Sequence, residues 1–386
     1  MSDAVMTGHY ESLGDLLAAV ASDYPDHEAY VFGDTRFTYA QWYTRALQEA
    51  GGLARRGVGA GDVVQLTLPT SIDFAVSYAA VQLLGAVASG VNTRLGRSEV
   101  AGIIARSGAT AIIEGDTDPR VPDTFTGLRV RVNDLADSAP LKSRPPVAAT
   151  DPAVIVWTSG TTGAPKGAWF DHAGHAAGAP CSGLLSAPFD RRLMPTPFAH
   201  AGFMTRVWDQ LAYVMTSVIT PVPWTVESML DSLLSERVTV GQGVPTQWEK
   251  LLGLLIGRTR LPGLRIAGTG AARVPAELVR GLRAQLDCPI LVRYSCSEVP
   301  IMTGTRPDDA PEILERTVGR GQDGVQIRVL DDNRQPASTG LLRQPDHHDY
   351  RLPHSVAVLL QRGRHRHPSG RRSLRNHPRS HVVQRL

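Results

Sequence analysis

The residues best suited to chemistry stand together at positions 158–167, which read TSGTTGAPKG. Glycines let a backbone approach a ligand closely and turn its N–H groups inward. Ser159, Thr161 and Thr162 add hydroxyl donors, and Lys166 adds a mobile positive charge. This combination of donors around one cation predicts a loop that holds phosphate.

The loop differs from the common phosphate-binding loop of nucleotide hydrolases. That loop reads G-x-x-x-x-G-K-[ST], whereas here Pro165 precedes the lysine and Gly167 follows it. An ordinary surface turn rich in threonine and glycine is the alternative. The ten-residue string directly after the apolar run AVIVW favours phosphate binding over such a turn.

Apolar runs alternate with amphipathic stretches up to about residue 330, and these elements must position the loop. The apolar runs predict strands at 62–69, 86–91, 110–115, 153–159, 238–245, 264–270 and 290–295. Thr38 and Gln41 predict a capping box at the start of a helix that closes near Gly57. Continuous apolar strands between helices favour mostly parallel sheets covered on both faces. The Pro-rich segment 143–152 predicts a surface connection between two such units, and a period-two pattern predicts a further strand near residue 325.

Composition excludes several classes of protein. With 386 residues and 42% hydrophobic content, the chain can bury a large core and form more than one structural unit. No apolar stretch reaches the about eighteen residues that a membrane-spanning helix needs, and the N-terminus lacks the pattern of a secretory signal. Three scattered cysteines favour neither a disulfide framework nor a metal cluster. We expect a cytoplasmic protein without a membrane span.

The last segment, 341–386, has a different composition. It contains ten arginines and two aspartates but no lysine. One interpretation is a basic arm that binds nucleic acid or acidic lipid. The other is a stretch without an evolved fold, such as one translated in a shifted reading frame. Because the segment has a single aromatic residue, Tyr350, we expect an irregular tail and no nucleic-acid partner.

The string TSGTTGAPKG resembles the signature loop of the adenylate-forming superfamily, which includes acyl-CoA synthetases, firefly luciferase and the adenylation domains of peptide synthetases. Further segments are similar to this family, in the family's order, over about residues 10–340. They are FTYAQW (37–42), GVGAGDVVQLTLPTS (57–71), GAVASGVNTRL (85–95), PFAHAGFM (197–204), GVPTQWEKLL (243–252), GTGAARVPAEL (268–278), RYSCSEV (293–299) and VGRGQDGVQIRVLDD (318–332).

The resemblance implies an α/β fold: the large N-terminal domain of adenylate-forming enzymes over residues 1–340. This domain has two α/β subdomains with mostly parallel sheets, followed here by an incomplete β-barrel subdomain and no C-terminal lid domain. The implied activity joins a carboxylic acid to ATP, with Mg²⁺, and then transfers the acyl group to coenzyme A. No acidic residue is clearly placed to receive a substrate ammonium, so we expect a fatty or other aliphatic acid rather than an amino acid.

The resemblance also assigns roles to single residues. Around the phosphates it places Thr158, Ser159, Gly160, Thr161, Thr162, Gly163 and Lys166. At the adenine it places Gly270, Ala271, Ala272 and Tyr294, with Ser297 at the α-phosphate. The catalytic residues that it implies are Lys166, Thr162, His200 and Glu298, with Glu298 as the magnesium ligand and His200 between the acyl pocket and the thiol tunnel.

Some of these residues have plainer interpretations. Glu298 could be a solvated charge, Tyr294 a core aromatic side chain and His200 a hydrogen-bonded core histidine. Ser295 also stands where the family usually has glycine.

Beyond residue 340 the family pattern continues with a Thr-Gly-Asp segment that holds the ribose, a hinge and a domain with a catalytic lysine. This sequence has none of these, and its last lysine is Lys250. We therefore expect a truncated or frameshifted acyl-CoA synthetase with impaired turnover. The alternative is a non-catalytic remnant that still binds nucleotide or acyl groups.

Overall fold

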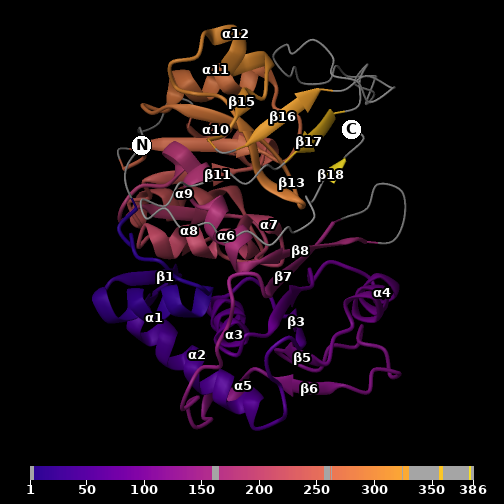
Figure 1. Ribbon diagram of the computed structural model, residues 1–386. Coiled ribbons are helices and arrows are strands. Elements are labelled where there is room, and N and C mark those ends of the chain that lie inside the picture. The colour runs from indigo at the N-terminus through magenta and orange to yellow at the C-terminus, as the bar shows by residue number, and fades with distance from the viewer. Residues whose placement is uncertain are drawn as a thin grey trace, which may run out of the picture.

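The computed structural model describes residues 4–158, 165–255, 261, 263–323 and 325–329, together with the backbone of 356–359 and 382–383. Figure 1 shows two stacked bodies, each built around a sheet that carries helices on its faces. The sheets have six and nine strands, and a third sheet has three strands. No helix in the described ranges combines the length and the apolar character needed to cross a bilayer.

The smaller body holds the six-stranded sheet, in the order β6-β5-β3-β4-β7-β8. Its strands are β3 (Val63–Thr67), β4 (Val87–Gly90), β5 (Ala111–Glu114), β6 (Leu128–Arg131), β7 (Pro152–Trp157) and β8 (Gly167–Asp171). Its helices are α1 (Leu13–Asp23), α2 (Tyr39–Ala54), α3 (Ile72–Leu83), α4 (Arg97–Ser107) and α5 (Asn133–Ala136). All neighbouring strands are parallel except β8, which runs antiparallel to β7.

The residue pattern explains how helices cover both faces of this sheet. Ala111 and Ile113 of β5 pack into the large core with α1, α2 and α3, whereas Ile112 packs with α4 on the opposite face. Such period-two alternation is what a strand covered on both sides requires. The predicted capping box is confirmed: the Thr38 hydroxyl accepts the Gln41 N–H, and α2 begins at the next residue.

The larger body holds the nine-stranded sheet, in the order β15-β14-β13-β12-β11-β9-β10-β1-β2. Its strands are β1 (Glu28–Phe32), β2 (Thr35–Thr38), β9 (Arg191–Met194), β10 (Thr216–Ile219), β11 (Val240–Gly243), β12 (Ile266–Gly270), β13 (Ile290–Cys296), β14 (Val299–Gly304) and β15 (Arg320–Gly321). The remaining helices are α6 (His172–Gly178), η1 (Pro180–Leu185), α7 (Ala201–Met204), α8 (Val207–Ala212), α9 (Val226–Ser235), α10 (Pro245–Leu255), α11 (Ala276–Gln285) and α12 (Pro311–Arg316).

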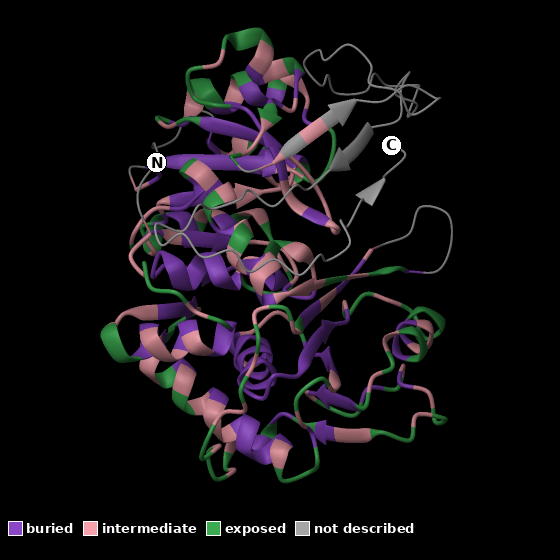
Figure 2. Ribbon diagram, in the orientation of Figure 1, coloured by how far each residue is buried: buried purple, intermediate pink, exposed green. Residues whose placement is uncertain are grey.

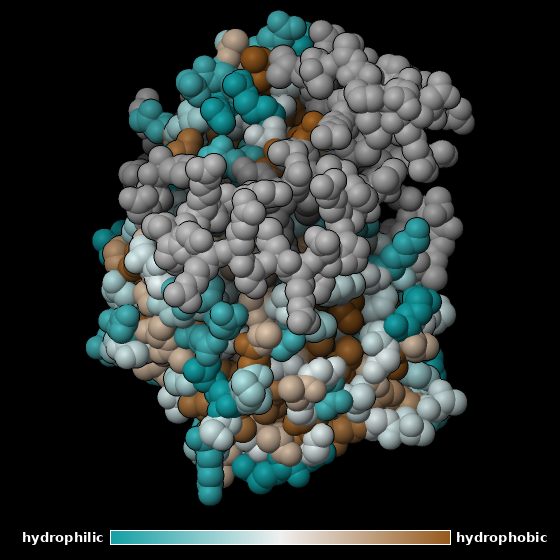
Figure 3. Space-filling view, viewed as in Figure 1, coloured by the Kyte–Doolittle hydropathy of each residue, from teal (hydrophilic) through white to brown (hydrophobic). Residues whose placement is uncertain are grey.

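Helices α9, α10 and α11 cover one face of the larger sheet with a core of their own. Figure 2 shows the strands of both bodies mostly buried and the exposed residues mainly on outer helices and loops. In Figure 3, hydrophilic side chains gather over α11 and α12 at the upper end, where Arg280 pairs with Glu277 and Glu315. These two helices therefore present a charged outer surface.

Aromatic side chains join the two bodies. Phe198 and Phe203, which follow β9, pack against Phe74 and Tyr78 of α3 with ring centroids 5.7–5.9 Å apart. The Tyr78 hydroxyl also donates to the Met204 carbonyl at 2.8 Å. Edge-to-face pairs of this kind add to the area that they bury, so α3 stabilises the junction between the sheets.

The predicted α/β class with mostly parallel sheets is confirmed, and each predicted strand corresponds to an observed one. The strand expected near residue 325 is β16 (Gln326–Val329), which pairs with β17 (Val356–Leu359) and through it with β18 (Val382–Val383). These three strands form an open sheet, and the described residues contain no closed barrel. The rest of the tail 341–386 lies outside the described residues.

One prediction about organisation is wrong. The Pro-rich segment 143–152 is half-buried or exposed, as expected, but it does not connect the two bodies. It leads from α5 to β7, and β7 pairs with β4 inside the six-stranded sheet. The error arises because composition marks a surface segment but does not reveal which strand the next one will pair with.

Glu49 is a fully buried carboxyl group on α2. It accepts a hydrogen bond of 2.7 Å from the Ser77 hydroxyl, and the Arg45 guanidinium lies 3.9 Å away. Burial outweighs both contacts and raises the pKa of Glu49 to about 8. The folded protein therefore keeps a proton on Glu49 that the unfolded chain releases at lower pH.

This proton makes stability depend on pH. A carboxyl pKa that is higher in the folded state stabilises the protein at low pH, and this contribution is lost as pH rises. We expect the free energy of unfolding to fall by up to about 1.4 kcal/mol per pH unit from about pH 5 to about pH 8. Glu49→Gln should flatten this slope in urea titrations at several pH values, whereas exposed Glu277→Gln should not. An unchanged slope in Glu49→Gln would assign the pH dependence to other groups.

Candidate active site

The predicted site residues follow the carboxyl ends of neighbouring strands in the larger sheet. β9, β11, β12 and β13 are parallel neighbours. His200 lies in the segment after β9, Gly270 ends β12, and Tyr294 to Glu298 occupy the end of β13 and its turn. In open α/β sheets, ligands bind outside the carboxyl ends of the strands. The topology therefore gathers these residues at one edge of the sheet.

The carboxyl ends of the smaller sheet face the same region. Asn92 follows β4, and its side-chain nitrogen lies 2.7 Å from His200 Nε2. The Phe198 N–H donates to the hydroxyl of Thr70, beyond β3, at 3.0 Å. Because Thr158 follows β7, the strand next to β4, the start of the predicted phosphate loop lies at this junction too.

The predicted phosphate loop connects β7 and β8 as a hairpin. The Thr158 N–H donates to the Lys166 carbonyl at 2.9 Å and closes the loop at its base. The Lys166 side chain is exposed. Ser159, Gly160, Thr161, Thr162 and Gly163 lie outside the described residues. β8 was not predicted from the sequence, because apolar and polar residues alternate only weakly in the segment after Lys166.

Trp157 anchors the strand that enters this loop. Its ring is buried, its Nε1 donates to the Ser89 hydroxyl at 2.9 Å, and the Arg106 guanidinium lies 5.9 Å from the ring centroid. These contacts hold the end of β7 against β4 and fix the direction in which the loop leaves the sheet.

The end of β12 makes a close approach to β13. A Cβ atom at Gly270 would collide with the Arg293 carbonyl oxygen, so a side chain does not fit there. The next residue, Ala271, has φ +62°, in the left-handed region that non-glycine residues seldom adopt. Ala272 is exposed beside it. The turn is therefore strained at Ala271, and its role at an adenine stays a prediction.

Tyr294, Ser297 and Glu298 belong to the hairpin between β13 and β14, in which Cys296 pairs with Val299. All three are half-buried. Burial, followed by Cys296 and Glu298, raises the pKa of Tyr294 to about 12, so its phenol stays neutral. Burial and then Glu298 likewise raise the pKa of the Cys296 thiol to about 11, and this thiol is hydrogen-bonded to Glu298. Ser295 lies within β13, at the point where the pairing of β13 with β14 shifts register between Tyr294 and Cys296.

His200 precedes α7 and is half-buried. Burial first, and the charge of Arg94 second, lower its pKa. The imidazole is therefore neutral near pH 7 and bridges to Asn92 across the two sheets. Its role at the boundary of an acyl pocket stays a prediction.

The sequence matches the AMP-binding enzyme family over residues 17–341. The chain belongs to this family. The Mycobacterium tuberculosis long-chain-fatty-acid–CoA ligase FadD13 is 30% identical over 310 residues, which cover 75% of this chain and 60% of that ligase. The 3-[(3aS,4S,7aS)-7a-methyl-1,5-dioxo-octahydro-1H-inden-4-yl]propanoyl:CoA ligase of the same organism is 30% identical over 342 residues, covering 80% and 66%.

A solved structure shows the same fold. The inhibitor-bound N-terminal domain of FACL13 from Mycobacterium tuberculosis has a TM-score of 0.77 and 25% identity, with coverage of 91% of this chain and 89% of that domain. The expected N-terminal domain of adenylate-forming enzymes is therefore confirmed. The AMP-binding chain spans about 60% of the length of the first of these relatives.

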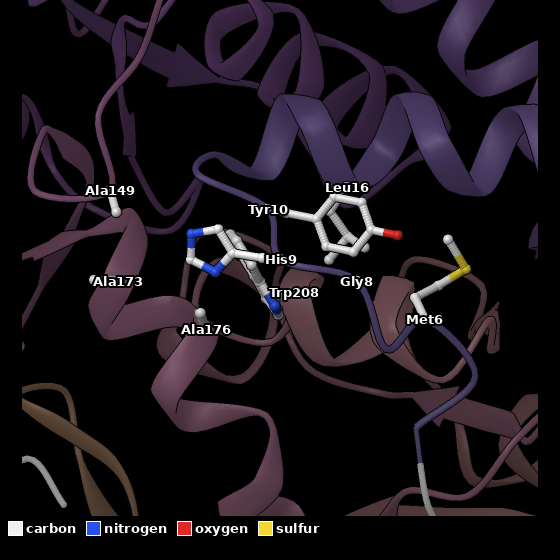
Figure 4. Close-up of a pocket in the computed structure, with 9 residues that line it drawn as sticks. All are labelled: Met6, Gly8, His9, Tyr10, Leu16, Ala149, Ala173, Ala176 and Trp208. Carbon is white, nitrogen blue, oxygen red and sulfur yellow. The ribbon is translucent and has the colours of Figure 1, made fainter. Parts of the chain in front are cut away.

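A separate cavity of about 240 Å³ lies beside the N-terminal segment of this AMP-binding enzyme. Figure 4 shows His9 and Tyr10 over Trp208 and the small residues Ala173 and Ala176. None of the predicted site residues lines it. The cavity is therefore distinct from the edge where the predicted residues gather.

Sequence analysis missed two residues of the site region. Asn92 stands in the segment GAVASGVNTRL, and the available signal was the change from apolar to polar residues just after a predicted strand. Arg293 directly precedes Tyr294, and its charge in an otherwise apolar strand was the corresponding signal.

Proposed function

We propose that this chain binds ATP, Mg²⁺ and a carboxylic acid at the carboxyl ends of its two sheets and carries out the adenylation step of an acyl-CoA synthetase. The observation that supports this most is the Asn92–His200 contact, which joins the loops of the two sheets. Around that contact lie segments that carry the predicted residues of an AMP-binding enzyme. We place the adenylation domain at residues 1–340 and treat 341–386 as a tail.

The chemistry brings a carboxylate to the α-phosphate of ATP and expels pyrophosphate. Such transfer needs charge neutralisation and alignment rather than a protein nucleophile. Lys166 and the hydroxyls of the 158–163 loop would hold the β- and γ-phosphates through charge-assisted hydrogen bonds. Tyr294 and the turn at Gly270 to Ala272 would bind the adenine, and Ser297 would donate to the α-phosphate.

Glu298 would hold the metal. The described residues contain no group of three or more acidic, histidine or cysteine side chains that is placed to hold a metal ion. A single half-buried carboxylate fits Mg²⁺, which takes one or two carboxylates and completes its shell with phosphate oxygens and water. Bound there, Mg²⁺ would neutralise phosphate charge.

We further propose that the acid is a fatty or other aliphatic acid and that the acyl group passes to coenzyme A beyond His200. The name of the FadD13 relative, a long-chain-fatty-acid–CoA ligase, supports the acid and the thiol. Cys181, Cys288 and Cys296 are all free, which supports a reducing compartment such as the cytoplasm.

The direct test is to incubate the full chain with ATP, Mg²⁺, coenzyme A and a series of aliphatic acids. We expect release of pyrophosphate that depends on the acid, and a CoA thioester detected by mass spectrometry. Binding of ATP without release of pyrophosphate would favour a non-catalytic binder. Absence of ATP binding would contradict the proposal.

Glu298→Gln should remove the effect of Mg²⁺ on ATP binding. We expect ATP affinity in the presence of Mg²⁺ to fall about tenfold or more, because a charged ligand to the bound complex is lost. In excess EDTA, Glu298→Gln should bind ATP with the same affinity as wild type. Isothermal titration calorimetry measures both values, with Glu277→Gln as the exposed control. The same Mg²⁺ effect in Glu298→Gln and in wild type would exclude Glu298 as the ligand.

A further inference from the structure

Charged side chains gather on the face of the larger sheet that η1 and α8 cover, opposite α9, α10 and α11. We call this face the inner face. Asp209 Oδ2 accepts hydrogen bonds from Arg192 at 2.7 Å, from Arg206 at 2.8 Å and from Ser186 at 3.0 Å. Arg192 and Asp209 are buried. One carboxylate therefore serves two guanidinium groups, which leaves this cluster with an excess of positive charge.

Arg293 adds a third guanidinium beside this cluster. It lies on the same face of β13 as Leu291, which packs against Leu185 of η1. Its Nη2 donates to the Ser182 carbonyl of η1 at 3.3 Å. Burial first, and the charge of Arg206 second, lower the pKa of Arg293 to about 10. Arg206 and Arg293 thus lie close enough to repel each other.

The guanidinium of Arg293 makes fewer hydrogen bonds than a buried charge needs among the described residues. Its Nε and Nη1 atoms are buried and have no hydrogen-bond partner within the part of the chain that the structure describes. A guanidinium carries five N–H donors, and a buried charge without a partner is strongly unfavourable. The free energy of this arrangement would improve if an anion bound beside Arg293.

Small residues keep space around this group. A Cβ atom at Gly304 would press against the Arg293 side chain, and one at Gly183 would lie 3.8 Å from its Nη2. Gln322, which also borders both glycines, is neutral. Gly304 thus gives room to the Arg293 side chain itself, and Arg293 as a residue is half-buried rather than buried, so part of it stays open to solvent.

Asp323, the acidic residue that contacts Cys181 of η1, does not neutralise Arg293. Asp323 contacts this region through its main-chain oxygen, which accepts from the Cys181 thiol at 3.1 Å. Its carboxylate is exposed and lies 3.9 Å from Arg306. Among the described residues, Asp209 pairs with Arg192 and Arg206, whereas Arg293 bonds to the Ser182 carbonyl and to no acidic side chain.

We propose that Arg293 binds a second acidic group of the acid substrate, so that the substrate is an aliphatic acid with a carboxylate at its far end. Arg293 directly precedes Tyr294 of the candidate site, but its side chain points to the inner face. A carboxylate there would supply the acceptors and the negative charge that the guanidinium lacks. A simple fatty acid would leave that charge buried and unpaired. The inference rests on the proposed function, from which it takes the acid.

The test compares two series of acids on the full chain by isothermal titration calorimetry. One series is butanedioate, hexanedioate, octanedioate and decanedioate, and the other contains the monocarboxylates of the same lengths. We expect at least one dicarboxylate to bind about ten- to a hundredfold more tightly than its monocarboxylate. Arg293→Met should abolish this preference, and Arg293→Lys should retain part of it because a charge remains without the planar fork. The exposed Arg306→Gln is the matched control.

Three outcomes of the binding experiment would overturn the inference: equal affinities in the two series, a preference that survives Arg293→Met, or binding of neither series. Arg293→Met should also melt no lower than wild type without ligand, since it removes an unpaired buried charge. A clearly lower melting temperature would likewise overturn it, by showing that a negatively charged group of the protein, and not only the Ser182 carbonyl, already pairs with Arg293. Binding of ATP by wild type and Arg293→Met tests the proposed function separately, so failure of the dicarboxylate preference leaves that function standing.

Discussion

Lys166→Ala is expected to weaken ATP binding by about ten- to a hundredfold, the loss expected for charge-assisted hydrogen bonds to phosphate. The side chain is exposed, and the backbone bond between Thr158 and Lys166 that closes the hairpin does not need it. The substitution should therefore leave the melting temperature unchanged. Isothermal titration calorimetry with ATP measures the effect.

Lys142→Ala provides the control for this result, because Lys142 is also exposed but directly precedes the Pro-rich segment 143–152. It should bind ATP like wild type. If Lys166→Ala bound ATP with unchanged affinity, the 158–167 loop would not hold the phosphates, and the proposed function would lose its main sequence motif.

Asp209→Ala is expected to destabilise the folded protein by about 3–5 kcal/mol, because it leaves two guanidinium groups without their shared carboxylate. Burial alone would raise the pKa of Asp209, but Arg206, Arg192 and the Ser186 hydroxyl outweigh it and lower the pKa. A lowered carboxyl pKa stabilises the folded state above the unfolded pKa, and this contribution is lost as pH falls through the folded pKa. The deficit of Asp209→Ala in urea unfolding should thus be full at neutral pH and shrink in acid.

The exposed Asp308→Ala serves as the control and should match wild type. In a second variant, Arg192→Met with Asp209→Leu, apolar side chains replace one ion pair, and part of the lost stability should return. An Asp209→Ala protein as stable as wild type would show that another anion balances these arginines.

Local sequence patterns predicted where helices and strands lie better than they predicted which strands pair with each other. The Thr38–Gln41 capping box and the apolar run of β12 act within a few residues, so periodicity and residue type sufficed. The pairing of β7 with β4 depends on contacts made after the chain has turned back, and no local pattern encodes it.

The same distinction holds for the site. Motifs placed His200, Gly270 and Glu298 on loops, and the parallel sheet then brought those loops to one edge. Asn92 and His200 are separated by 108 residues, and the arginines around Asp209 come from different elements. Such contacts follow from tertiary packing, so the sequence marked these residues only by their polar or charged character.

The position of β1 and β2 has a consequence for dividing the chain. These strands precede every strand of the smaller sheet in sequence, yet β1 pairs with β10 near one end of the larger sheet. The two bodies are thus interlaced, and a cut between β8 and β9 would separate β10 from its neighbour and expose a hydrogen-bonding edge. We therefore expect neither the part before this cut nor the part after it to fold on its own. The two bodies should reach their native state together.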